Sequence, residues 1–408
     1  MKLQHIILCL FIFFFISTYA RCSTADSNEF FPIYYVGGNG IGNFSSISEA
    51  ISEAPAYTQI KVFPGWYNES IDLYKPLHVI SIIPHQAKLY YNGSDDTVEI
   101  TADGCILEGF NITHMVGRGY TSVSVTGNHN TIQNNIFYQN PERGLYFFNC
   151  KYNLIRDNHF FSDGIFIVGD KSEWNTHIFL NNSVNDKEIL VLKNVSNFTI
   201  SNESYGQIIL INCTQVYINN CTVDNSDQGI VLGHCNLCTV NNNSIFHTLY
   251  GIHLSYSENC YIQSNMIQSN EYGIYIIHSN KNIVTTNTLN NQTRYGIYIC
   301  CNSKNNRLYQ NKFVNNNRSA YDLFSNQWQY NKIGNYWSDY YGSDDNNDGI
   351  GESKYFIDGD TAVDPYPLID PSFSIIDPTK SSKQIPVDSL ILFFICIILI
   401  LLFRKIKY

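Results

Sequence analysis

Four short segments decide the fold of this chain: Gly229-Ile-Val-Leu, Gly251-Ile-His-Leu, Gly273-Ile-Tyr-Ile and Gly296-Ile-Tyr-Ile. Their glycines lie 22, 22 and 23 residues apart. A fixed period near 22 residues that carries one short strand pattern is typical of a solenoid, in which successive coils stack along one axis. The pattern therefore predicts the fold, and it also predicts that most residues serve to stack coils rather than to react.

The alternation inside these segments predicts which side chains face the core. The residue after each coil start is aliphatic, and so is the residue two positions further, as in a strand with a buried face. The residue between them should point outward. In the eight coils that can be aligned, it is Tyr146, Phe166, Leu190, Ile209, Val231, His253, Tyr275 or Tyr298.

A column of asparagines repeats with the same period. Asn243, Asn265, Asn287 and Asn311 follow the four glycines by fourteen or fifteen residues. We expect their side chains to turn inward and bond the backbone, because identical side chains lie about 4.8 Å apart in stacked strands; ligand binding by the column is the alternative. The period contains no helix-length segment and no leucine-rich signature, so the sequence predicts an all-β parallel β-helix.

A short amphipathic helix is predicted before the first strands, over residues 46–54. Ser46 and Glu49 fit a capping box, and Pro55 ends the helix. Such a helix would cover the open end of the solenoid and the unpaired backbone of its first coil.

The bulk composition argues against nucleic acid as a partner. The 408 residues carry a net charge of −10, and only 15% of them are charged. An acidic chain is a poor match to a phosphate backbone. Thirteen Asn-x-Ser/Thr sequons are compatible with an exported glycoprotein.

Both ends of the chain carry targeting patterns. Residues 1–25 have a basic start, an apolar run and a small-x-small cleavage site, and we interpret them as a secretory signal peptide. Residues 387–403 are apolar and precede a basic tail, which predicts a single-pass membrane helix with the repeats outside the cell. The predicted organisation is a signal peptide (1–25), an N-terminal cap (26–60), the β-helix (61–333), a C-terminal cap (334–370), a linker (371–386), the transmembrane helix (387–403) and a cytoplasmic tail (404–408).

Several segments are similar to a known family. Tyr34-Tyr-Val, Phe44-Ser-Ser-Ile-Ser-Glu-Ala-Ile, Ile60-Lys-Val-Phe-Pro-Gly-Trp-Tyr-Asn-Glu and Ile106-Leu-Glu-Gly-Phe-Asn-Ile resemble the opening of pectin-lyase-like right-handed β-helix proteins. Gly334-Asn-Tyr-Trp-Ser-Asp-Tyr-Tyr, Asp344-Asp-Asn-Asn-Asp-Gly-Ile-Gly and Asp364-Pro-Tyr-Pro-Leu resemble the C-terminal end of NosD-like proteins, which are often archaeal surface proteins. The resemblance covers roughly residues 33–370 and implies a right-handed, single-stranded parallel β-helix with carbohydrate-binding-and-sugar-hydrolase-type repeats. It leaves the activity open, because the family includes lyases, hydrolases, epimerases and a copper-site maturation factor.

No catalytic set stands out in the sequence. Sugar hydrolysis needs two carboxylates that face each other, yet Glu258 and Glu271 are the only acids between residues 229 and 320. We therefore expect a non-catalytic surface protein, an adhesin or cell-envelope component that contacts glycans. The alternatives are a polysaccharide lyase or glycoside hydrolase, and a copper-binding protein of the NosD type.

Two columns of aromatic residues are the candidate carbohydrate-binding residues. One is the outward stripe His253, Tyr275 and Tyr298, and the other is formed by Tyr250, Tyr272 and Tyr295 just before the glycines. Aromatic faces on a long sheet can stack sugar rings, but they can also shield the sheet without any ligand.

Two clusters are candidates for metal ions or disulfides. Asp344, Asn346, Asp348 and Ile350 match the first half of a calcium loop, although Tyr355 occupies the position of the expected glutamate. Copper is disfavoured because methionine is scarce. Aligned coils place Cys213 over Cys235 and Cys238 under Cys260, which predicts stacked thiols, disulfides or, as a third alternative, a soft-metal site.

Overall fold

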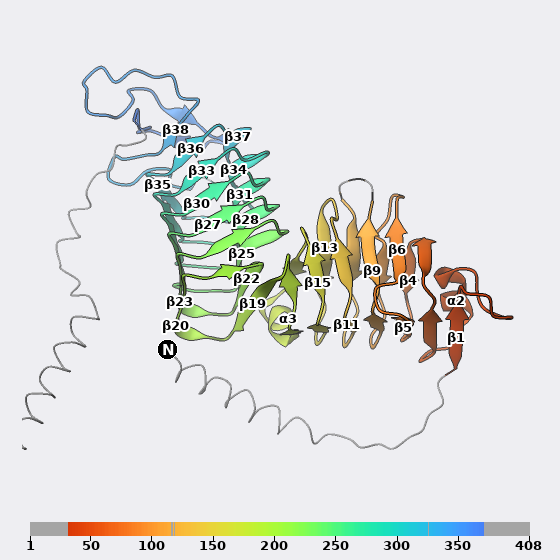
Figure 1. Cartoon of the computed structure of the whole chain (residues 1–408). Helices are drawn as coiled ribbons and strands as arrows, with labels where there is room; N and C mark the ends of the chain where they lie inside the picture. Colours follow the sequence, from red (N-terminus) through yellow and green to blue (C-terminus); the bar gives the residue numbers. More distant parts are fainter. Residues whose placement is uncertain (1–31, 116, 118, 325, 371–408) are drawn as a thin grey trace, which may run out of the picture.

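The computed structural model describes residues 32–370, apart from 116, 118 and 325. The chain forms a right-handed parallel β-helix, as predicted, but the coils are stacked in two blocks that are not collinear (Figure 1). The predicted signal peptide, linker, membrane helix and cytoplasmic tail lie outside the described residues. Within the described part of the chain, no helix is long and apolar enough to span a membrane.

The first block has three parallel sheets, one for each side of its coils. One sheet has the order β1 (Ile33–Val36), β2 (Gln59–Val62), β5 (His78–Ser81), β8 (Ile106–Glu108), β11 (Thr131–Gln133), β14 (Leu154–Arg156) and β17 (Ile178–Leu180). Another contains β4 (Ile71–Leu73), β7 (Val98–Ile100), β10 (Thr121–Val125), β13 (Arg143–Phe148) and β16 (Ile165–Val168).

The third sheet, here called the long sheet, runs through both blocks. Its first-block strands are β3 (Gly65–Asn68), β6 (Ala87–Tyr91), β9 (Asn111–His114), β12 (Ile136–Tyr138), β15 (His159–Phe161) and β18 (Ser183–Val184). Its second-block strands are β19 (Lys187–Lys193), β22 (Gln207–Ile211), β25 (Gln228–Gly233), β28 (Tyr250–Ser255), β31 (Tyr272–Ile277), β34 (Tyr295–Cys300), β37 (Arg318–Asp322) and β40 (Asp358–Gly359).

Two further sheets complete the second block. One contains β20 (Ser196–Ser201), β23 (Thr214–Asn219), β26 (Thr239–Asn241), β29 (Tyr261–Gln263), β32 (Ile283–Thr285) and β35 (Arg307–Tyr309). The other contains β21 (Ser204–Tyr205), β24 (Thr222–Asp224), β27 (Ser244–Phe246), β30 (Met266–Gln268), β33 (Thr288–Asn290), β36 (Lys312–Val314) and β38 (Tyr336–Trp337).

The N-terminal helix α2 (Ile47–Glu53) closes the first block, as predicted. The Ser46 side chain accepts a hydrogen bond from Glu49 N at 3.1 Å, so Ser46 is the N-cap. Only half of the predicted capping box forms, because the Glu49 carboxylate bonds Ser45 rather than Ser46. Ile47, Ala50 and Ile51 are buried against the first coils.

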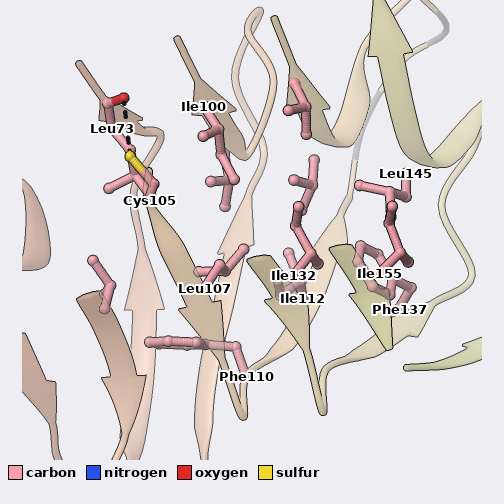
Figure 2. Close-up of a cluster of buried hydrophobic side chains, with 14 of the residues drawn as sticks. Leu73, Ile100, Cys105, Leu107, Phe110, Ile112, Ile132, Phe137, Leu145 and Ile155 are labelled. Atoms are coloured by element: carbon pink, nitrogen blue, oxygen red, sulfur yellow. Dashed lines mark hydrogen bonds between the residues drawn. The ribbon is translucent and has the colours of Figure 1, made fainter. Parts of the chain in front are cut away.

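The core follows the predicted alternation. Stacked aliphatic and aromatic side chains, such as Leu107, Ile132 and Ile155, fill the first block (Figure 2). The asparagine column is confirmed as structural: Asn243, Asn265, Asn287 and Asn311 are buried, and each bonds the next one along the column. Every Nδ2 also donates to a backbone carbonyl of the preceding coil, for example Asn265 to Val240 O at 2.9 Å.

The repeated glycines reflect close approach of stacked backbones. A Cβ atom on Gly251 would lie 2.5 Å from Gly273 O, and one on Gly273 would lie 2.5 Å from Gly296 O. A side chain at either position would push two coils apart, so only glycine fits.

The corner between the blocks forms at residues 183–189. Strands β18 and β19 pair antiparallel, whereas every other neighbouring pair in the long sheet is parallel. The last coil of the first block, with β16 and the helix α3 (Lys171–Thr176), then packs against the outer face of β22 and β25. Ile209 and Val231 point outward from the second block, as predicted, but are only 1% exposed because they join the first block's core.

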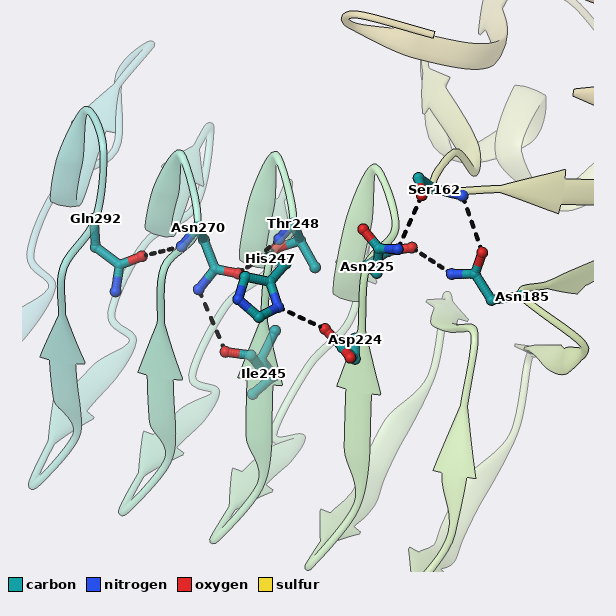
Figure 3. Close-up of polar contacts among 9 residues, drawn as sticks. All are labelled: Ser162, Asn185, Asp224, Asn225, Ile245, His247, Thr248, Asn270 and Gln292. Atoms are coloured by element: carbon teal, nitrogen blue, oxygen red, sulfur yellow. Dashed lines mark hydrogen bonds and ion pairs between the residues drawn. The ribbon is translucent and has the colours of Figure 1, made fainter. Parts of the chain in front are cut away.

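Polar contacts fix the corner. Gln207 exchanges two hydrogen bonds with the backbone of Ile165, at 3.0 and 2.8 Å, and so continues the edge of β16. Asn225 Nδ2 donates to Ser162 Oγ at 2.9 Å, and Asn185 Nδ2 donates to Asn225 O at 2.8 Å (Figure 3). The two blocks are therefore held by hydrogen bonds as well as by apolar packing.

The C-terminal cap is built around Asp364. Its buried carboxylate accepts hydrogen bonds from Asn335 N, Trp337 Nε1 and Tyr366 N at 2.7, 2.9 and 3.0 Å. Trp337 stacks on Phe313 of the last full coil, with ring centroids 4.2 Å apart. A short antiparallel pair, β39 (Tyr355–Phe356) and β41 (Val363–Asp364), completes the cap and covers the open end of the core.

Candidate functional site

Two adjacent columns of tyrosines run along the outer face of the long sheet in the second block. Tyr250, Tyr272 and Tyr295 form one column, with neighbouring ring centroids 5.2 and 6.1 Å apart. Tyr275, Tyr298 and Tyr321 form the other, with centroids 5.4 and 4.6 Å apart and planes within 12°. We call these six residues the tyrosine strip.

The geometry of the strip changes what it can offer a ligand. Because neighbouring rings are nearly parallel and in stacking contact, each ring covers much of its neighbour's face. The strip therefore presents mainly ring edges and phenol hydroxyls rather than open faces. Burial raises the pKa of Tyr298 to about 12, so its hydroxyl stays protonated and can donate hydrogen bonds at any ordinary pH.

Arginines flank the strip. Arg294 donates to Tyr272 Oη at 2.8 Å and Arg318 donates to Tyr295 Oη at 3.0 Å. Both guanidinium groups are about half exposed and are also paired with acids, Arg294 with Glu271 at 3.0 Å and Arg318 with Asp358 at 3.6 Å. The strip is thus a row of hydrogen-bonding groups with compensated charge.

His253 differs from the other predicted carbohydrate-binding residues. It points outward from β28, as expected, but is only 1% exposed because Phe166 of the first block lies over it, with ring centroids 5.7 Å apart. Burial lowers the pKa of His253 to about 3, so the ring is neutral. Its Nδ1 lies 2.9 Å from Gln228 Nε2. His253 is a contact of the corner and is out of reach of a ligand.

A wall from the first block closes one end of the strip. The Phe166 ring contacts Tyr250 at a centroid distance of 5.7 Å. Arg143 lies over the Phe166 ring, 4.7 Å from its centroid, and over Tyr146 at 5.0 Å. Arg143, Tyr146 and Phe166 therefore stand over the end of the strip at β28, and we call them the wall.

A polar pocket of about 310 Å³ opens between the two blocks beside this wall. Glu142 and Ser162 line it from the first block, and Asp227, Leu249 and Glu271 line it from the second. The Glu142 carboxylate lies 3.0 Å from Arg143, and that of Glu271 lies 3.0 Å from Arg294. Both glutamates of the pocket, which are largely buried, are therefore already paired with arginines.

A pair of buried carboxyl groups joins the blocks beneath this pocket. Asp163 is 0% and Asp227 is 4% exposed. Asp227 Oδ2 accepts from Gly144 N and Gly164 N, both at 2.9 Å, and the Asp163 carboxylate accepts from Asn140 N and Nδ2. Because these bonds use backbone and amide donors of the corner, the pair holds the two blocks together, and Asp227 also borders the pocket.

Burial raises the pKa of both carboxyls. It raises the pKa of Asp227 to about 7, while the Gly144 and Gly164 amides and the Arg143 charge act in the opposite direction. The pKa of Asp163 is raised first by burial and then by the charge of Asp227. One proton between the two groups is therefore favoured at neutral pH.

We expect the corner to weaken as pH rises. A carboxyl with a raised folded-state pKa stabilises the protein below its unfolded pKa, and that contribution is lost as pH rises through the folded value near 7. Asp163→Asn removes one ionisable group at almost constant volume. The melting temperature of this variant minus that of the wild type should therefore be larger at about pH 8 than at about pH 5.

Because the other titrating groups are present in both proteins, their contribution to the pH dependence of stability is removed when the variant is compared with the wild type. Buried His177 and His253, whose pKa values burial lowers to about 4 and about 3, act in the opposite direction in both proteins. A difference between variant and wild type that stays constant over this pH range would show that the folded-state pKa of Asp163 is not raised.

The predicted calcium loop is exposed and has an ordered hydrogen-bond pattern. Asp344 accepts from Asp348 N at 3.0 Å and Gly349 N at 2.9 Å, and Asp348 accepts from Ile350 N at 2.9 Å. Carboxylate oxygens have further lone pairs, so these bonds do not use up their capacity for a cation. Calcium binding by Asp344, Asn346, Asp348 and Ile350 stays a prediction.

The cysteine register is as aligned, because β26 pairs with β29 and the bridge Thr214–Asn236 sets Cys213 beside Cys235. The nine cysteines of the described residues are all free thiols, and Cys213, Cys235, Cys238 and Cys260 are fully or almost fully buried. Burial raises the pKa of Cys235 well above the ordinary thiol value. Within residues 32–370, apart from the three undescribed positions, no group of three or more His, Cys, Asp or Glu side chains is arranged to hold a metal.

The comparison with protein families places the similarity mainly in the second block. Residues 181–342 match the family described as "Periplasmic copper-binding protein (NosD)". This part of the chain is NosD-like. A "Probable ABC transporter binding protein NosD" from Stutzerimonas stutzeri is 39% identical over 75 residues, and the match spans 17% of this chain and 17% of that protein.

Solved β-helix structures are similar at low identity. A pectate lyase is 18% identical with a TM-score of 0.30, and the match covers 73% of this chain and 80% of the lyase chain. An alginate lyase from Paenibacillus is 14% identical with a TM-score of 0.34, and the match covers 63% of this chain and 94% of the lyase chain. The NosD resemblance is thus confirmed for residues 181–342, and the β-helix itself is established by the strand pairing.

Sequence reasoning missed two parts of the site. Tyr321 extends the second tyrosine column, and aligning Arg318-Ser-Ala-Tyr with Tyr295-Gly-Ile-Tyr as a ninth coil would have found it. The wall residues Arg143 and Phe166 carry no local signal for their role, because it depends on how the two blocks pack.

Proposed function

We propose that this chain is an exported, non-catalytic NosD-like β-helix protein that binds glycans at the cell surface. The observation that carries the proposal is the tyrosine strip with its flanking arginines. The phenol hydroxyls of Tyr272, Tyr295, Tyr298 and Tyr321 and two guanidinium groups repeat along the coil axis, about 4.8 Å per coil, on a partly exposed surface. A repeating row of hydrogen-bond donors and acceptors suits a polymer whose hydroxyl groups also repeat.

Several further points support a binding role over the alternatives. The Asp163 and Asp227 carboxyls are buried and hydrogen-bonded to the backbone and amide groups of the corner, and the two glutamates of the pocket are paired with arginines. Export is supported by the signal-peptide pattern of residues 1–25 and by the periplasmic description of the matching family. Anchoring through residues 387–403 belongs to the same proposal.

A panel of polysaccharides tests the proposal. The full-length protein is expected to bind at least one neutral or acidic polymer in a pull-down with insoluble or immobilised glycans. The panel is run with calcium and with chelator, because the 344–350 loop is the predicted calcium site. Shortening of the bound polymer during the assay would favour the lyase or hydrolase alternative.

A further inference from the structure

The tyrosine strip is open along its length but closed at one end. At β28 the next outward residue of the second column is His253, which Phe166 covers. A polymer that follows the strip along the coil axis therefore meets the wall of Arg143, Tyr146 and Phe166. The two blocks meet near β19 and their axes lie at an angle to each other (Figure 1), and we expect the first block to stop a stiff chain that runs along the strip.

The pocket between the blocks lies at the foot of this wall. Leu249 and Glu271, which line it, directly precede Tyr250 and Tyr272 of the strip. Glu142, on the opposite side, directly precedes Arg143 of the wall. The pocket therefore lies at the end of the strip that the wall closes. Both blocks contribute polar residues to its lining.

We propose that the protein recognises the end of a glycan chain, with the terminal sugar in the pocket between the blocks and the following sugars along the tyrosine strip. This inference rests on the proposed function and specifies how the same site is used. The pocket supplies hydrogen-bonding partners for the extra hydroxyl group of a terminal sugar. The wall excludes chain interiors, because a continuing polymer would have to pass through Phe166.

The stoichiometry of binding to polymers of different length tests the proposal. Size fractions of two linear polymers, pullulan and polygalacturonate, and of any other linear polymer that the panel identifies are titrated by calorimetry with the full-length protein. End recognition predicts one binding site per chain regardless of length, so the number of sites per gram falls as the chains lengthen. A number of sites per gram that stays constant with length would mean binding along the chain and would overturn end recognition.

A pocket-filling variant gives a second readout. Leu249→Trp places a bulky side chain in the pocket without removing a charged or hydrogen-bonding side chain, and it should weaken binding about tenfold. Leu180→Trp is the matched control, since Leu180 is a 50% exposed leucine of β17 that lies outside the pocket lining and outside the long sheet. Equal affinity of the Leu249 variant and the wild type would also contradict end recognition. Absence of any binding by the wild type would instead defeat the proposed function itself.

Discussion

Asn265→Leu is expected to lower the free energy of unfolding by about 4 kcal/mol, since it leaves several buried polar groups unpaired. Asn265 Oδ1 accepts from Asn243 N and Nδ2 at 2.9 and 3.0 Å. Its Nδ2 donates to Val240 O and to Asn287 Oδ1 at 2.9 and 2.8 Å. Leucine has a similar volume but no polar atoms, so an amide N–H and a carbonyl in the core lose their partners.

Urea unfolding followed by circular dichroism measures this loss. Asn241→Leu is the matched control, because Asn241 lies in the preceding coil but is only partly buried, and its side chain donates a single bond, to Asn219. The control should change stability by about 0.5 kcal/mol or less. If the two variants unfolded at the same urea concentration, the asparagine column would not be the structural element that we describe.

Replacing Tyr272, Tyr295, Tyr298 and Tyr321 with phenylalanine is expected to weaken glycan binding by about a thousandfold, since each of the four lost hydrogen bonds contributes roughly 1 kcal/mol. The phenylalanine rings can keep the stacking between coils, so the fold should persist. Isothermal titration with a polymer that the panel identifies measures the effect.

A control pair separates the strip from tyrosines in general. Tyr217 and Tyr261 are 48% and 41% exposed and lie on a different sheet of the second block. Tyr217→Phe with Tyr261→Phe should leave the affinity unchanged. A loss of binding in the control of the same size as in the strip variant would show that the strip is not the site.

The coil register could be read from sequence because it is local and repeated. Each Gly-Ile-x-Ile segment places two side chains inward and one outward, and the strand pairing keeps that assignment in every coil from β22 to β34. The inward asparagines follow from the same period. These features depend on neighbouring coils with nearly identical sequences, so the pattern of one coil predicts the next.

The corner could not be read in the same way, because it depends on contacts between distant coils. A signal was nevertheless present: the outward position is apolar in Ile209 and Val231, and such residues on a solvated face would be costly. They are buried by the first block. The same packing removes His253 from the surface and converts an open strip into one with a closed end.

The stacking of the tyrosines also changed the expected mode of binding. The sequence suggested aromatic faces for sugar rings, whereas Tyr298 and Tyr321 lie face to face at 4.6 Å. What remains for a ligand are the hydroxyl groups, the ring edges and the arginines. Outward orientation follows from the period of two, but the ring tilt depends on the side chains of both neighbours.

Binding to the polysaccharide panel, measured side by side for the full-length protein and its four-phenylalanine variant, tests whether the tyrosine strip is a glycan-binding site. We expect the wild type to bind at least one polymer and the variant to lose most of this affinity while keeping the wild-type circular dichroism spectrum. A wild type that binds no polymer, or a folded variant that binds as tightly as the wild type, would contradict this expectation.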